Sequence, residues 1–146
     1  MGSKRDAFET SILQHIFQNM AVSGIGDSSG ILGSSTAGNL AVALFTTNPS
    51  DSTTGTETSY TNYNRINVAR SSVGWTVTAG QASNAAAITF AQCGAVGATL
   101  TGFGVMKSAT TGADDCIYWG ALGANLTVSS GITPEFAIGA LTVTED

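Results

Sequence analysis

Residues 39–45 have the sequence NLAVALF, and this stretch decides the fold class. Its even-numbered positions hold leucine or valine, and its odd-numbered positions from 41 onward hold alanine or phenylalanine. Successive side chains of a β-strand point to opposite faces of the sheet, so an extended conformation makes both faces of this segment apolar. A strand with two apolar faces is typically covered on both sides. The stretch therefore predicts a covered strand within a β-rich domain.

Downstream of this strand the chain continues as short extended runs separated mostly by glycine-containing joints. Residues 46–64 are rich in Thr, Ser, Asn and Gly, which predicts a surface loop. Further strands are expected near residues 65–70, 73–79, 85–91, 98–107, 115–121, 125–129 and 135–144, the last with a bulge around Gly139 and Ala140. Seven or eight short strands without a second helix predict a mainly β fold. We expect an antiparallel β-sandwich or jelly-roll-like domain over residues 39–146.

Upstream, residues 6–20 carry the only helical pattern. Asp6 followed by Glu9 resembles a capping box, which predicts a helix start with Asp6 as its cap. Apolar residues recur every four positions and would form a stripe along one face of a helix. Further apolar residues on one side widen this stripe, so an amphipathic helix is expected. It could be buried against a neighbouring chain or against the chain's own sheet. The interface candidates on this stripe are Phe8, Ile12, Ile16, Phe17 and Met20.

Residues 21–38 contain five glycines and show no apolar periodicity, which predicts a long loop or connecting arm. The expected domain organisation is therefore a helix with a glycine-rich arm over residues 1–38 and a β domain over residues 39–146.

Charged residues make up only 10% of the chain, against roughly 25% in ordinary soluble domains. The cores of protein–protein interfaces are depleted of charge in the same way, so we expect these surfaces to be covered in an assembly. Arg65 and Arg70 are two of only five cations, and they are expected to pair with acidic groups across an interface. On that interpretation, Arg65→Ala would weaken assembly more than folding.

The sequence offers little that predicts chemistry. A single histidine, His15, excludes a recognisable catalytic triad, and the two cysteines, Cys93 and Cys116, are too few for a zinc cluster. We therefore expect no catalytic residue, no metal site, no cofactor and no enzymatic activity. Tyr60 and Tyr63 lie in a polar loop, and they are the residues that could form an exposed platform for sugars.

The net charge of −5 makes nucleic-acid binding unexpected, because such binding depends on neutralising phosphates with Lys and Arg. No run of 18 apolar residues occurs, so no membrane span is expected either.

Six segments of the chain follow one another in a characteristic order: NLAVALFTTNP (39–49), YNR (63–65), ASNAAAITF (82–90), LTGFGVM (100–106), YWGAL (118–122) and ITPEFAIGALTVT (132–144). Their order resembles that of a family of small β-rich virion proteins of tailed bacteriophages. Members of this family are labelled tail-fibre proteins, and similar small β proteins act as capsid cement. The chain departs from the family at Phe45, where histidine is usual, at Gln92, where proline is usual, and in its longer 21–38 arm. The first departure argues against a functional histidine in that segment.

The resemblance implies a virion structural role, with assembly in the host cytoplasm. The first hypothesis is a capsid cement or decoration protein that binds the outer shell through the major capsid protein and copies of itself, as a trimer. The second is a compact tail or tail-fibre component that binds tail proteins and acts as an adaptor or a host-contacting module. A carbohydrate-binding module is the third.

Overall fold

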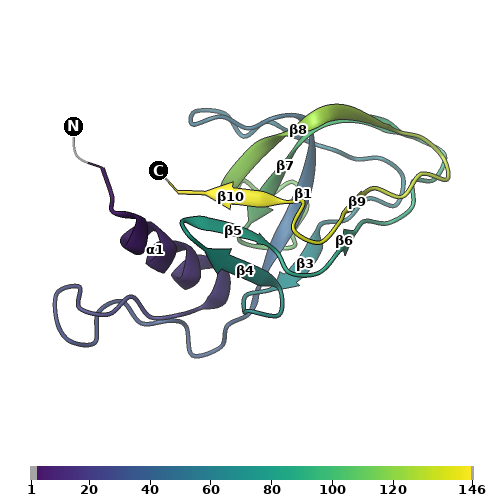
Figure 1. Cartoon of the computed structure of the whole chain (residues 1–146). Helices are drawn as coiled ribbons and strands as arrows, with labels where there is room; N and C mark the ends of the chain where they lie inside the picture. The colour runs from purple at the N-terminus through teal and green to yellow at the C-terminus, as the bar shows by residue number, and fades with distance from the viewer. Residues whose placement is uncertain (1–2, 146) are drawn as a thin grey trace. The chain divides into compact units, whose positions relative to one another are not determined.

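The computed structural model describes residues 3–145 of the chain (Figure 1). The predicted fold class is confirmed, because the structure is mainly β with antiparallel sheets and has, within the described residues, one helix near the N-terminus. The chain divides into two compact units. The first comprises the chain up to Asn39, Ala69–Ala87 and the chain from Phe136 on, and the second comprises Leu40–Val68 and Ile88–Glu135. The expected division between residues 38 and 39 stays a prediction.

The first unit packs the helix α1 (Asp6–Gln18) against a small antiparallel sheet (Figure 1). This sheet has the strand order β10 (Thr142–Thr144), β5 (Gln81–Asn84) and β4 (Trp75–Thr78). A two-residue turn joins β4 to β5, and both of its residues have positive φ angles, 49° at Ala79 and 72° at Gly80. Turns of this kind match the twist of two antiparallel strands, which explains the tight hairpin.

The helix α1 is shorter than predicted at its C-terminal end. Asn19 adopts a left-handed conformation with φ 59° and ends the helix, which was expected to continue to residue 20. The predicted cap by Asp6 does not form, because Asp6 already lies inside the helix and Arg5 occupies the N-cap position without a side-chain cap. Asp6 and Glu9 instead place negative charge in the first turn, where it interacts favourably with the helix dipole.

The second unit is built around β1 (Asn39–Thr47), and the prediction of a covered strand is confirmed, since every residue from Leu40 to Phe45 is buried. Its main sheet has the order β2 (Thr56–Glu57), β1, β7 (Ala98–Met106) and β8 (Cys116–Val128), while β3 (Ile66–Ala69) also pairs with β1. The short strands β6 (Ile88–Thr89) and β9 (Glu135–Phe136) form a separate pair.

Three sequence-based expectations for the strands need correction. Residues 46–64 are not only a loop, because they contain β2. The predicted strand over residues 135–144 is two strands, β9 and β10, in different sheets, and the chain turns between them at Gly139, which has φ 72°. The two strands predicted over residues 115–129 are one strand, β8. Its pairing shifts from Gly102↔Ala121 to Leu100↔Leu126, so residues 122–125 bulge opposite Thr101.

In the part of the chain that the structure describes, no helix has the length and apolar character needed to cross a bilayer.

Candidate functional site

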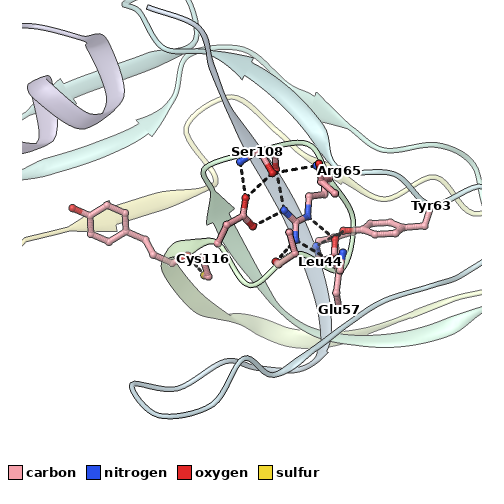
Figure 2. A network of polar contacts seen from close by, with 11 residues as sticks. Leu44, Glu57, Tyr63, Arg65, Ser108 and Cys116 are labelled. Carbon is pink, nitrogen blue, oxygen red and sulfur yellow. Dashed lines mark hydrogen bonds and ion pairs between the residues drawn. The ribbon is translucent and has the colours of Figure 1, made fainter. Parts of the chain in front are cut away.

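The most highly organised polar site in the second unit is centred on Arg65 (Figure 2). The Arg65 side chain is fully buried. Its Nε and Nη2 donate to the two carboxylate oxygens of Glu57 at 2.9 and 3.0 Å, and its Nη1 donates to Asp115 at 2.7 Å. The two remaining N–H groups donate to the backbone carbonyls of Ser108 and Ala113, each at 2.9 Å. All five guanidinium hydrogens are therefore satisfied within the chain.

The two carboxylates of this cluster are also bonded to other groups. Glu57 accepts hydrogen bonds from the Tyr63 hydroxyl and from the Gly112 N–H, both at 2.7 Å. Asp115 accepts from the N–H and the hydroxyl of Ser108. Tyr63 in turn accepts a hydrogen bond from the N–H of Leu44 in β1 (Figure 2). The cluster thus ties the loop over residues 108–115 to β1 and β2.

The electrostatics of the cluster favour its ionised form. Burial alone would raise the pKa of Glu57, but hydrogen bonds from Arg65, Gly112 and Tyr63 and the charge of Arg65 lower it overall. Burial likewise opposes ionisation of Asp115, and hydrogen bonds from Ser108 and Arg65 together with the Arg65 charge lower its pKa. Burial raises the pKa of Tyr63, so this hydroxyl stays protonated and acts as a donor to Glu57.

Acidification is expected to weaken the folded chain through this cluster. The pKa values of Glu57 and Asp115 are depressed in the folded state, so their stabilisation is complete above the ordinary values of 4.5 and 3.8 and is lost as the pH falls through the lowered values. The free energy of unfolding, measured by urea denaturation, should therefore decrease below about pH 4.5, and Glu57→Gln should reduce this dependence. Asp114→Asn, at an exposed neighbour, is the control. A Glu57→Gln variant with an unchanged pH dependence would show that the ion pair contributes nothing.

A groove of about 420 Å³ lies beside this cluster in the same unit. One wall is the turn over residues 49–54, and the other consists of Asp114 and the beginning of β8 at Cys116, Ile117 and Trp119. Asp114 stands between two residues that Arg65 holds, Ala113 through its carbonyl and Asp115 through its carboxylate. The buried cluster therefore fixes one wall of the groove.

The two arginines expected to pair across an interface are both engaged within the chain. Arg65 finds its acidic partners in Glu57 and Asp115. Arg70 donates to the carbonyls of His15 and Ile16 and to the Asn19 side chain, so it caps the C-terminal end of α1. Cations are favourable at this end of a helix because its last carbonyls lack intrahelical partners.

The five interface candidates of the predicted helical stripe differ in how deeply they are buried. Phe17 is fully buried and packs edge-on against Trp75 of β4, with ring centroids 4.7 Å apart. Ile12 and Ile16 are half-buried, and Phe8 and Met20 are exposed. Of the two alternatives for the stripe, the chain's own sheet accounts for Phe17. Contact of Phe8 and Met20 with a neighbour stays a prediction.

Tyr60 and Tyr63 do not form an exposed platform. Both rings are buried and pack against each other at a centroid distance of 5.3 Å, and Tyr63 stacks on Phe90. Their hydroxyl groups are satisfied inside the unit, since Tyr60 donates to the carbonyl of Ala91 and Tyr63 to Glu57. The composition of residues 46–64 predicted a surface loop. The two tyrosines of this segment instead anchor it to the core.

Three residues of this region were missed by the sequence reasoning. Trp119 was not among the candidate residues, and it is 45% exposed and lines the groove. Glu57 and Asp115 had no signal that they converge, because they are far apart in the sequence. The available hint was Arg65 itself. Because cations are rare in this chain, such a residue can be expected to have acidic partners. The cysteines are both free, with Cys93 buried and Cys116 half-buried.

Comparison with known proteins gives one family. A family model described as podophage GP4 fiber I protein gp80 matches residues 5–144. No curated protein matches the chain.

Proposed function

The chain belongs to the podophage GP4 fiber I protein gp80 family and is a phage structural protein of the fibre type, and from this premise we propose that it is a compact tail-fibre component. In this role it packs against copies of itself and against tail proteins, and it performs no catalysis. The family description supports a fibre, and the surface of the first unit supports packing.

The observation that carries this proposal is a pair of exposed apolar side chains in the first unit. Val73 is 78% exposed and Ile138 is 72% exposed. Gly74, which follows Val73, accepts a hydrogen bond from Ala85, and Gly139, which follows Ile138, donates one to Asn84. Both residues therefore lie at the same end of the β10–β5–β4 sheet, on either side of β5. A neighbouring chain that covered this end of the sheet would remove both side chains from water, which is favourable.

The distribution of cations supports the same proposal. Of the five Lys and Arg residues, Arg65 is buried, Arg70 binds the end of α1, and Lys4 pairs with Glu145 at 3.2 Å. Positive charge at the surface is therefore even scarcer than the composition indicates. A surface of this kind gains little affinity from ion pairs, so contact area and shape must supply it.

The strand β8 adds a second surface of this type. Among the described strands it pairs only with β7, and its thirteen residues include no charged side chain. Exposed edge strands are usually protected by charges, prolines or bulges against pairing with other chains. The protection in β8 consists of two irregularities in its pairing with β7, one at Ile117 and one over residues 122–125, so the last residues of the strand, from Leu126 on, offer backbone groups to a neighbouring chain.

The assembly surface can be tested with charged substitutions. Val73→Asp combined with Ile138→Asp should leave the melting temperature nearly unchanged, because both side chains are exposed, but should weaken self-association and incorporation into particles by about tenfold or more. Ser72→Asp adds one negative charge at the adjacent exposed residue, and it is the matched control for Val73→Asp alone. Light scattering coupled to size-exclusion chromatography and mass spectrometry of purified particles give the two readouts. If the double variant assembles like the Ser72→Asp control, this surface has no role.

Capsid cement is the alternative location for the same packing chemistry. It would use the major capsid protein as partner, and the acidic balance of the chain suits a position away from the DNA. Copy number separates the two roles, since cement requires many copies over the shell and a fibre component few copies at the tail.

A further inference from the structure

We propose that the groove between residues 49–54 and the start of β8 binds a neutral carbohydrate, with Trp119 as its stacking surface. This inference concerns ligand binding by the second unit, and it is independent of the location proposed for the chain in the particle. Four features of the groove carry it: an exposed indole ring, a set of carboxylate and hydroxyl groups, the absence of cations in its lining, and rigid walls.

The first feature is the exposure of Trp119. The chain has two tryptophans, and the other, Trp75, is fully buried in the first unit. Trp119 lines the groove together with Ile117, which belongs to the same strand, β8. An exposed indole combines a flat apolar surface with an N–H donor, and this combination suits a ligand with apolar C–H faces and polar edges. A pyranose ring has that chemistry.

The second feature is the set of polar groups around the ring. The carboxylates of Asp51 and Asp114 make no hydrogen bond or ion pair with any residue that the structure describes, and both line the groove. The turn between Pro49 and Thr54 adds the hydroxyl group of Ser52 and those of Ser50 and Thr53, which are bonded to each other. Carboxylates accept hydrogen bonds only, whereas hydroxyls both donate and accept. Together they match the several hydroxyl groups of a sugar.

The third feature limits the class of ligand. No Lys, Arg or His is among the residues that line the groove, while two carboxylates are. Phosphorylated or carboxylated sugars would meet like charge there, which is unfavourable. The groove therefore favours an uncharged sugar over an anionic one. Its volume of about 420 Å³ falls within the range of roughly 300–1,000 Å³ that is typical of small-molecule sites.

The fourth feature is that both walls are fixed before any ligand arrives. The turn is closed by paired backbone hydrogen bonds between Ser50 and Thr53, whose hydroxyls also lie 2.7 Å apart. On the other wall, Asp114 is held by the Arg65 cluster through both of its neighbours. Fixed walls reduce the entropy lost on binding, which matters for a weak ligand such as a single sugar.

The proposal can be tested by saturation-transfer NMR with glucose, galactose, mannose and N-acetylglucosamine as probes. At least one of these should bind the full chain, and Trp119→Ala should weaken that binding by about tenfold or more, whereas Trp119→Phe should retain part of it. Val96→Ala, at an exposed apolar residue of the same unit that lies outside the groove lining, should bind like wild type. Glucuronic acid should bind more weakly than glucose, because its carboxylate meets the negative charge of the groove. Asp114→Asn removes one of these charges and should therefore reduce the difference in affinity between the two sugars.

Fluorescence provides a second, independent readout. Trp75 is buried, so quenching by acrylamide reports mainly on Trp119, and a bound sugar should protect it. The proposal is overturned if none of the four neutral sugars binds, if Trp119→Ala binds as tightly as wild type, or if glucuronic acid binds as well as glucose. Circular dichroism of Trp119→Ala should match wild type, because the side chain is half exposed. Particle incorporation by this variant should also be unchanged, which separates this site from the assembly surface.

Discussion

Arg65→Met is expected to lower the free energy of unfolding by about 3–5 kcal/mol. The substitution keeps much of the volume of the side chain but removes the positive charge between Glu57 and Asp115. Those two carboxylates would then be left in a nearly dry environment with backbone and hydroxyl donors as their remaining partners. Breaking a buried ion pair by removing one partner is costly for this reason. Urea denaturation at neutral pH measures the loss.

Two controls make this prediction specific. Lys107→Met removes an exposed cation and should change the free energy of unfolding by less than about 0.5 kcal/mol. Adding Glu57→Gln and Asp115→Asn to Arg65→Met should recover part of the loss, because no unpaired charge then stays buried. Without Arg65 the pKa values of both carboxylates should rise, so the deficit of Arg65→Met should shrink as the pH is lowered. A loss below about 1 kcal/mol at neutral pH would mean that the cluster is not essential to the fold.

Phe17→Ala is expected to lower the free energy of unfolding by about 3–5 kcal/mol. The ring is completely buried and meets Trp75 edge-on, so its removal leaves a cavity between α1 and β4. Phe8→Ala is the matched control on the same helix, since Phe8 is 39% exposed, and it should cost about 1 kcal/mol or less. Thermal denaturation of the two variants at several protein concentrations gives the comparison.

The concentration series distinguishes the two partners that the sequence left open for this helix. If the chain's own sheet covers Phe17, the loss is independent of protein concentration. If a neighbouring chain covers it instead, dilution would remove this contact from the wild type as well. The difference in melting temperature between wild type and Phe17→Ala would then shrink as the protein concentration falls. Equal effects of Phe8→Ala and Phe17→Ala would also contradict the packing described here.

Local sequence patterns were sufficient for the fold class. The NLAVALF segment was predictable as a covered strand because its two faces are both apolar, and the helix was predictable from its four-residue period. The ends of the helix and of the strands were harder to predict. Asn19 ends α1 through a left-handed conformation that periodicity does not report, and Gly139 turns the chain where alternation predicted a bulge.

The Arg65 cluster could not be predicted from the sequence, for a different reason. Its charged members lie at positions 57, 65 and 115, and the sheet order β2-β1-β7-β8, which links β2 to β8 through two intervening strands, helps to bring them together. The sequence therefore led to an expected effect of Arg65 on assembly, whereas its complete burial predicts an effect on folding. Trp119 could not be recognised as a groove residue because a strand pattern of mixed apolar residues does not reveal which face of an edge strand stays open.

The most direct test of the central proposal is electron microscopy of phage particles labelled with gold-conjugated antibodies against this protein. A tail-fibre component that packs through charge-poor surfaces predicts label confined to the tail, at few copies per particle, and loss of that label with Val73→Asp and Ile138→Asp. Label spread over the capsid shell in many copies, or particles without label, would contradict it.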